Sequence, residues 1–155
     1  MRAVVQRAAR AGVRVEGSTI GEIGPGLLVL LSVGPDDVDA VAVRLAQRVA
    51  TLRIFPDDGG RMNVDLAQAG GSILVVSQFT LHADASRGHR PSFIRAGAPD
   101  EAERLCDVFV AALRDRALVV QTGRFGAHME VELVNDGPVT LVLTSGEGAW
   151  PADAG

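Results

Sequence analysis

Two hydroxyl groups and one amide stand at the end of an apolar stretch in the middle of the chain. The stretch is Ile73–Val76, and the segment Ser77–Leu81 follows it directly. A buried strand rarely carries such groups without hydrogen-bond partners, so they are the first candidates for chemistry. The simpler interpretation of the pattern is an edge strand whose hydroxyls bond nearby backbone. If the segment instead leaves its neighbouring strands, its free N–H groups can point at a carbonyl oxygen as oxyanion donors.

The tetrapeptide Asn-Asp-Gly-Pro at 135–138 is the second candidate, and it separates two apolar alternating stretches. Asp-Gly is a strong turn signal, so the pattern predicts a hairpin turn between two strands. The bond between Gly137 and Pro138 carries the general preference for trans, since only about 5–6% of X–Pro bonds in folded proteins are cis. A cis bond would direct two carbonyl groups the same way on a rigid tip.

The remaining reactive side chains favour structural roles. His82, His89 and His128 have no metal-ligand spacing with a cysteine, so we expect no metal site and interpret His82 as a solvated loop residue. Cys106 falls on the inward stripe of a predicted helix, where a free cysteine behaves as a small hydrophobe. No Gly-x-Ser-x-Gly elbow surrounds Ser77, which leaves an α/β-hydrolase triad unsupported. All 15 basic residues are arginine, which removes lysine-based Schiff-base and phosphate-loop chemistry.

Bulk composition narrows the partners and the compartment. The chain has 155 residues, enough for one domain with its own core, and its longest apolar run, Leu27–Val33, is too short to cross a bilayer. We therefore expect no membrane partner. A net charge of −4 argues against a broad DNA-binding face, although local arginine contacts with a few phosphates stay open. The single cysteine allows no intrachain disulfide, which favours a cytoplasmic setting.

Hydrophobic periodicity predicts a single strand-rich α/β domain over residues 1–144, with 145–155 as a flexible C-terminal tail. Strands are expected over 1–7, 13–16, 18–23, 27–33, 51–55, 72–79, 118–121, 128–134 and 139–144. Two main helices are expected over Val38–Ala50, capped by Asp36-Asp37, and from Pro99 to about Arg116. The predicted inward residues are Val38, Val41, Leu45 and Val49 in the first helix, and Ala102, Leu105, Phe109 and Leu113 in the second. The helices are expected to cover one face of a sheet or barrel-like sheet.

Several motifs, in order along nearly the whole chain, resemble the D-aminoacyl-tRNA deacylase family in its widespread bacterial and eukaryotic form. The matching segments are Met1–Arg7, Gly21–Leu27, Leu52–Phe55, Ser77–Leu81, Arg90–Phe93, Thr122–Ala127 and Asn135–Thr140. Many long motifs in the right order are more specific than any one of them. His82 stands where the family often has tyrosine, and Asp84–His89 replaces a more basic loop.

This resemblance implies a homodimer that hydrolyses the ester between a D-amino acid and the terminal adenosine of tRNA, and that also removes glycine mischarged on tRNA for alanine. By position, the pocket is lined by Ser77, Gln78, Phe79 and Thr80. Gly137-Pro138 corresponds to the family's cis dipeptide, which enters the partner subunit's pocket, and Arg7 is implied to help hold it. A steric wall against an L side chain would select D-amino acids and let glycine pass. Nothing in the sequence calls for a cofactor.

The implied mechanism uses the 2′-hydroxyl of the tRNA ribose to assist, with protein N–H groups holding the developing oxyanion. The sequence agrees, because no His–Ser, Cys–His or paired-carboxylate arrangement stands out as a general base. Thr80 as nucleophile is the competing mechanism, although a threonine hydroxyl is weak without an activating base. Two other functions stay open. One is a non-catalytic RNA-binding module, which 4% aromatic residues make less favoured; the other is a serine hydrolase of small esters.

Overall fold

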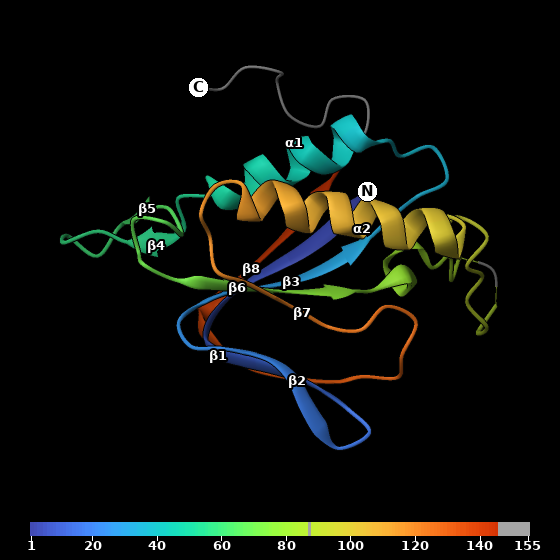
Figure 1. The fold of residues 1–155 in the computed structure, drawn as a ribbon, viewed down its shortest axis with the longest axis horizontal. Coiled ribbons are helices and arrows are strands. Elements are labelled where there is room, and N and C mark those ends of the chain that lie inside the picture. The colour runs from blue at the N-terminus through green and yellow to red at the C-terminus, as the bar shows by residue number, and fades with distance from the viewer. Residues whose placement is uncertain (87, 146–155) are drawn as a thin grey trace.

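The computed structural model describes residues 1–86 and 88–145 of the chain (Figure 1). The elements in chain order are β1 (Arg2–Val15), β2 (Ser18–Ile23), β3 (Gly26–Ser32), α1 (Asp39–Ala50), β4 (Phe55–Pro56), β5 (Met62–Val64), β6 (Ser72–Ser77), the 3-10 helix η1 (Phe79–His82), α2 (Pro99–Arg114), β7 (Val120–Thr122) and β8 (Glu130–Thr144). The predicted strand-rich α/β class with two main helices is confirmed. Apart from Ser145, the predicted C-terminal tail lies outside the described residues.

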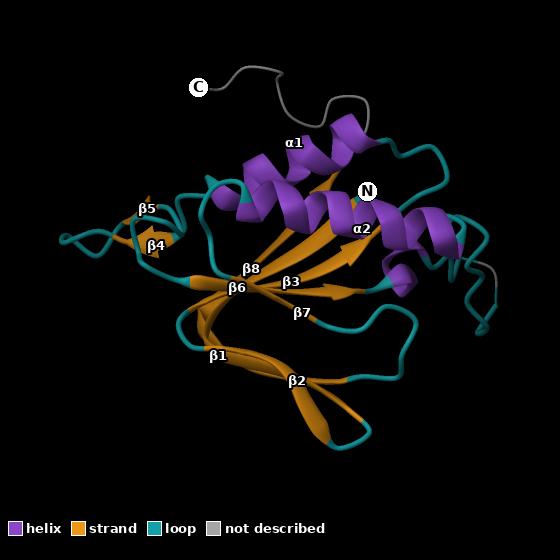
Figure 2. Cartoon of the chain, viewed as in Figure 1, coloured by secondary structure: helices purple, strands orange, loops and turns teal. Residues whose placement is uncertain are grey.

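Six of the strands form one mixed sheet in the order β2-β1-β3-β6-β7, with β8 paired to β1. The strands β2, β3 and β8 run antiparallel to β1, whereas β3, β6 and β7 run parallel to one another. The connections β3-α1-β6 and β6-α2-β7 advance across the sheet in the same direction. The right-handed preference of such crossovers accounts for both helices lying on one face (Figure 2).

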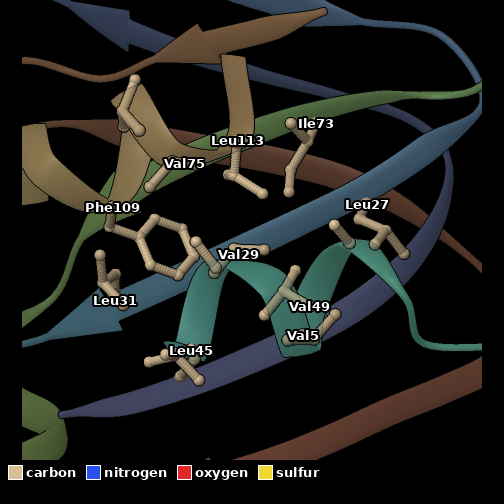
Figure 3. Packing of buried hydrophobic residues seen from close by; sticks show 14 of the residues in the cluster. Val5, Leu27, Val29, Leu31, Leu45, Val49, Ile73, Val75, Phe109 and Leu113 are labelled. Atoms are coloured by element: carbon tan, nitrogen blue, oxygen red, sulfur yellow. The ribbon is translucent and has the colours of Figure 1, made fainter. Parts of the chain in front are cut away.

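The sheet curls because β1 is long and changes partners along its length. Its first half pairs with β3, its second half pairs with β2, and β8 follows it on the other side throughout. One apolar cluster fills the space under the helices, where Phe109 of α2 points toward Val29 and Leu31 of β3 (Figure 3). A second cluster, which includes Val13, Leu28 and Leu74, fills the concave side of the curled strands. These two cores give the barrel-like sheet that was predicted.

The predicted core stripe of α2 is confirmed, since Ala102, Leu105, Phe109 and Leu113 are all buried. In α1, Leu45 and Val49 are buried as predicted and Val41 is partly buried against the core, but Val38 precedes the helix and is 56% exposed. The predicted Asp36-Asp37 cap is wrong, because α1 starts at Asp39 and the carboxylate of Asp37 accepts from the N–H of Gly34 at 2.6 Å instead. In the described ranges neither helix is long and apolar enough to cross a bilayer.

The segment predicted as a strand over 51–55 is irregular until Phe55. Thr51 continues the end of α1, because its backbone N–H donates to the carbonyl of Gln47 at 3.1 Å and its hydroxyl does so at 2.9 Å. Leu52 and Ile54 are buried without belonging to a strand. Their apolar character therefore reflects burial against the core rather than strand pairing, which is why the alternation misled the prediction.

The last two predicted strands are one continuous strand, β8, and the predicted hairpin turn between them is wrong. β8 pairs with β1 on both sides of the tetrapeptide 135–138, with Ala8 opposite Asn135 and Gln6 opposite Thr140. The register shifts between these pairs, so the tetrapeptide is a bulge in a paired strand. The turn signal of Asp-Gly was real, but the pairing to β1 keeps the chain direction unchanged.

Candidate functional site

The parallel strands β3, β6 and β7 bring their carboxyl ends to one edge of the sheet, the edge where ligands bind in open α/β folds. β6 ends at Ser77, which pairs with Leu31 of β3. Because β6 lies between β3 and β7, the simpler interpretation of an edge strand is wrong. The N–H of Gln78 still donates to the carbonyl of Leu31 at 2.7 Å, and the chain then turns into η1.

This turn frees two backbone donors. The first hydrogen bonds of η1 run from the N–H of Leu81 to the carbonyl of Gln78 at 3.2 Å and from the N–H of Ala83 to that of Thr80 at 3.0 Å. The N–H groups of Phe79 and Thr80 precede them in the turn, and no acceptor in the described part of the chain bonds to either one. The departure from the neighbouring strands, which oxyanion donors at this segment would require, is therefore present.

A cavity of about 430 Å³ opens beside this segment. Val76, Ser77, Gln78 and Phe79 form one wall, residues 96–102 at the start of α2 form the second, and residues 125–131 form the third. Sequence reasoning identified only the first wall, and Thr80, which it also expected to line the pocket, is not among the lining residues of this cavity. The lining is largely apolar, and its one titratable side chain among the described residues is His128. An apolar cavity with a few polar groups at one side is the usual form of a small-molecule site.

Gly97 allows the second wall to reach the sheet. Its N–H donates to the carbonyl of Val33 at 2.9 Å, just beyond the end of β3. A Cβ atom at this position would lie 3.0 Å from the carbonyl oxygen of Gly34 and 3.3 Å from that of Val33. Only glycine permits this close approach without displacement of the backbone. Glycine at 97, before the proline that starts α2, was the signal that could have identified this wall.

Thr80 lacks the partner that a nucleophile needs. Its hydroxyl accepts a hydrogen bond from the side-chain amide of Gln78 at 2.5 Å. Within residues 1–86 and 88–145, no imidazole or carboxylate is hydrogen-bonded to the hydroxyl of Thr80 or of Ser77. An unactivated hydroxyl is a weak nucleophile. The geometry therefore favours the backbone N–H groups of this segment over its hydroxyls.

Gly137 and Pro138 are exposed at the tip of the β8 bulge, and the bond between them is cis. Asn135 closes the base of the bulge, because its side-chain oxygen accepts from the N–H of Val139 at 2.8 Å and its side-chain nitrogen donates to the carbonyl of Val139 at 3.2 Å. Neither Gly137 nor Pro138 is among the residues that line the cavity. Within one chain, the two candidate segments are therefore not brought together.

Arg7 is buried behind the bulge and contacts the residue that precedes the dipeptide. Its Nε atom donates to the carbonyl of Asp136 at 2.9 Å and lies 3.1 Å from the carboxylate of the same residue. Its Nη1 atom donates to the carbonyl of Ile54 at 2.5 Å. A planar guanidinium bonded at several points fixes its partners well. These contacts are the ones that a residue holding the dipeptide would make.

The interpretation of His82 as a solvated residue is wrong, because only 8% of His82 is exposed. The turn of η1 places the ring at the carboxyl end of β3, with Nδ1 at 2.5 Å from the hydroxyl of Ser32. Burial lowers the pKa of His82, and the positive charges of Arg2 and the Met1 α-amino group lower it further, whereas Asp37 opposes the shift. The polar residues around His82 in the sequence did not indicate that its side chain is buried.

We expect His82 to make the protein less stable in mild acid. The folded state lowers its pKa below the unfolded value of about 6.5, so the unfolded state binds the proton more readily. Above about pH 6.5 the imidazole is neutral in both states and the folded state keeps its full stability. As the pH falls below that value, the unfolded state gains the proton first and the free energy of unfolding decreases. Urea unfolding at pH 8 and pH 5.5 should show a smaller loss for His82→Asn than for the unchanged chain. Replacement of the exposed His89 by asparagine should leave the original pH dependence, and an equal loss in His82→Asn would contradict the assignment.

Cys106 occupies the structural position that its helical register predicted. It is partly buried and packs against the core under the helices. Burial, assisted by the nearby negative charges of Asp107 and Glu103, raises the pKa of its thiol to about 12. The group is therefore a thiol at neutral pH and is unsuited to nucleophilic attack. Over the described ranges, no three His, Cys, Asp or Glu side chains are arranged to hold a metal ion.

Comparison with known proteins identifies one family that matches nearly the whole chain. The family model for D-Tyr-tRNA(Tyr) deacylase matches residues 4–144. A D-aminoacyl-tRNA deacylase of Symbiobacterium thermophilum is 55% identical over 145 residues, which cover 94% of this chain and 96% of the relative. A D-aminoacyl-tRNA deacylase of Klebsiella pneumoniae is 58% identical over 143 residues, with 92% and 99% covered.

Solved structures share the fold. A structure described as c-Myc DNA unwinding element binding protein is 38% identical and superimposes with a TM-score of 0.88, covering 94% of this chain and 99% of the other. A probable eukaryotic D-amino acid tRNA deacylase, 18% identical, gives a TM-score of 0.77 over 92% and 97% of the two chains. The shared fold and the named relatives thus place the chain among hydrolases of the deacylase type. The chain belongs to the D-Tyr-tRNA(Tyr) deacylase family, which confirms the resemblance seen in its motifs.

Proposed function

We propose that this protein is a cytoplasmic editing enzyme that cleaves the ester of D-aminoacyl-tRNA and of glycyl-tRNA mischarged on tRNA for alanine. The observation that carries the proposal is that the N–H groups of Phe79 and Thr80 have no acceptor among the described residues, and that Phe79 lines an apolar cavity. Such donors stabilise the oxyanion that forms when an ester carbonyl is attacked. Membership of the deacylase family supplies the class of ester.

Selection of the amino acid is assigned to a second copy of the chain. Gly137 and Pro138 are exposed and lie outside the cavity of their own subunit, so they are free to enter the cavity of a partner in a homodimer. The exposed apolar side chains of Val134 and Val142 on the same strand support burial of this face. Carbonyl groups of the dipeptide would hold the substrate's α-amino group and leave a wall where an L side chain projects. Glycine has no side chain, so the wall does not exclude glycyl-tRNA.

The chemical step is assigned to the substrate and the backbone together. The 2′-hydroxyl of the terminal ribose assists the attack of water on the ester carbonyl carbon. The bond from that carbon to the ribose oxygen then breaks, and the free amino acid and the tRNA leave. During the attack, the N–H groups of Phe79 and Thr80 hold the negative oxygen. This mechanism needs no metal and no cofactor, and it agrees with the bonding of Thr80, whose hydroxyl is engaged by Gln78.

The test is deacylation of one tRNA charged with matched D- and L-amino acids, with glycyl-tRNA as a third substrate. We expect the D and glycyl esters to be hydrolysed at least about 100-fold faster than the L ester, because a steric wall acts on the L side chain alone. The uncatalysed hydrolysis of each ester is the control. Equal rates on the D and L esters would overturn the proposal.

The same preparation decides between the proposal and its rivals. Tight binding of D-aminoacyl-tRNA without cleavage would favour a non-catalytic RNA-binding module. Cleavage of a generic small ester without tRNA, together with inactivation by a serine-directed reagent, would favour a serine hydrolase. The absence of any imidazole or carboxylate bonded to Ser77 among the described residues argues against that last rival.

A further inference from the structure

Three polar or charged residues are buried in the described part of the chain: Arg7, Ser32 and His82. Arg7 is explained by its contacts with the bulge of β8. Ser32 is the last residue of β3 and His82 the last residue of η1, and their side chains are in contact. The chemistry proposed above uses neither side chain. Burial of a polar pair is unfavourable unless its hydrogen bonds are satisfied, so the burial of Ser32 and His82 needs an explanation.

The pair reaches the backbone of η1 through one chain of hydrogen bonds. The hydroxyl of Ser32 lies 2.5 Å from Nδ1 of His82 and donates to the carbonyl of Phe79 at 3.4 Å. Because a serine hydroxyl has a single proton, both contacts are satisfied together only when Nδ1 of His82 carries a proton and donates to Ser32. The order is therefore His82 to Ser32 to Phe79. Arg2 adds a second hydrogen bond to the backbone of η1, since its Nη1 atom donates to the carbonyl of Leu81 at 2.7 Å.

The carbonyl of Phe79 and the N–H of Thr80 belong to the same peptide unit. That unit is planar and trans, so its C=O and N–H point in opposite directions. The hydrogen bond from the hydroxyl of Ser32 to the carbonyl of Phe79 therefore directs the N–H of Thr80 away from Ser32. The same rule applies one residue earlier, where the N–H of Leu81 holds the carbonyl of Gln78 and so directs the N–H of Phe79.

We infer that Ser32 and His82 are positioning residues, which orient the N–H of Thr80 as an oxyanion donor by holding the carbonyl of Phe79. The inference rests on the proposed function, because it assigns a purpose to the same two N–H groups. It adds that the strength of the donor depends on side chains that never touch the substrate. Gly34 is part of this arrangement, since a Cβ atom there would lie 3.3 Å from Nε2 of His82.

The test compares variants that break or keep the chain of hydrogen bonds. Ser32→Ala and His82→Leu break it, whereas His82→Asn keeps a side-chain N–H at the position of Nδ1. We expect the first two to lower kcat for D-aminoacyl-tRNA about 10- to 100-fold with KM changed less than about threefold, because donor misplacement acts on the transition state. His82→Asn should restore kcat to within about threefold of the unchanged protein.

Leu66→Ala is the matched control for lost stability, because Leu66 is fully buried but packs near Gly71, before the amino end of β6 and far from the site. It should lower the unfolding midpoint and leave kcat unchanged. If His82→Leu does not fold, the amide resonance of Thr80 in Ser32→Ala gives the same information, and an unshifted resonance overturns the inference. Normal kcat in Ser32→Ala and His82→Leu also overturns it while the proposed function stands. An inactive unchanged protein overturns both.

Discussion

Replacement of Gly137 by alanine is expected to reduce the ratio of D- to L-aminoacyl-tRNA hydrolysis by about 10- to 100-fold. Gly137 has φ of +148°, which L residues rarely adopt. A Cβ atom there would lie 2.6 Å from the backbone nitrogen of Val139 and 2.7 Å from its Cγ2 atom. The alanine variant must therefore shift the backbone at the tip of the bulge. A displaced tip no longer places the wall where an L side chain projects.

The displacement should stay local, which makes the result interpretable. Asn135 bonds both backbone polar groups of Val139, and Arg7 bonds the carbonyl of Asp136, so both flanks of the tip are held. Gly70→Ala is a matched control, because Gly70 also has positive φ, at +65°, but lies in open space away from the site. It should lower stability by about 1 kcal/mol and leave selectivity unchanged. An unaltered D to L ratio in a folded Gly137→Ala dimer would contradict the assigned role of the dipeptide.

Removal of the 2′-hydroxyl from the terminal adenosine of the substrate is expected to slow hydrolysis by about 10²- to 10⁴-fold, the usual contribution of a positioned proton-transfer group. Thr80→Ala should keep kcat within about threefold, because alanine retains the backbone N–H and the lost hydroxyl has no base beside it in the described structure. Single-turnover deacylation measures both effects. The tRNA with an intact terminal adenosine, charged with the same amino acid, is the control.

The two mechanisms predict opposite results in this experiment. If Thr80 were the nucleophile, Thr80→Ala would abolish turnover and the 2′-deoxy substrate would be cleaved nearly as fast as the normal one. Undiminished hydrolysis of the 2′-deoxy substrate would therefore exclude assistance by the substrate. A large loss in both arms would mean that the hydroxyl of Thr80 contributes in some way besides nucleophilic attack, for example by holding Gln78.

Elements whose burial repeats regularly along the chain were predictable. The four inward residues of α2 recur at helical spacing, and all of them are buried. Residues 27–33 form an apolar run that reads as a strand buried on both faces, and β3 is such a strand. In both cases the local pattern and the final packing agree. The family motifs carried further, since they identified a segment whose residues Ser77, Gln78 and Phe79 line the cavity, although Thr80 does not.

Errors arose where a distant partner overrode a local signal. Asp-Gly-Pro predicted a chain reversal, yet pairing with β1 on both sides keeps β8 continuous. Leu52 and Ile54 alternate like strand residues, but they are buried without strand pairing. His82 lies in a segment that also holds exposed residues, and its buried ring contacts Ser32, 50 positions away in the sequence. Local patterns carry no information about such contacts.

The sequence by itself determined the class of fold, the family and the segment with the chemical groups, because periodicity and motif order are local properties. Tertiary structure alone decided which groups of that segment are free to act. Bonding of Gln78 to β3 and the turn of η1 leave the N–H groups of Phe79 and Thr80 unbonded within the described structure. Orientation of a peptide unit depends on what holds its carbonyl, and here that is Ser32, a residue from another strand.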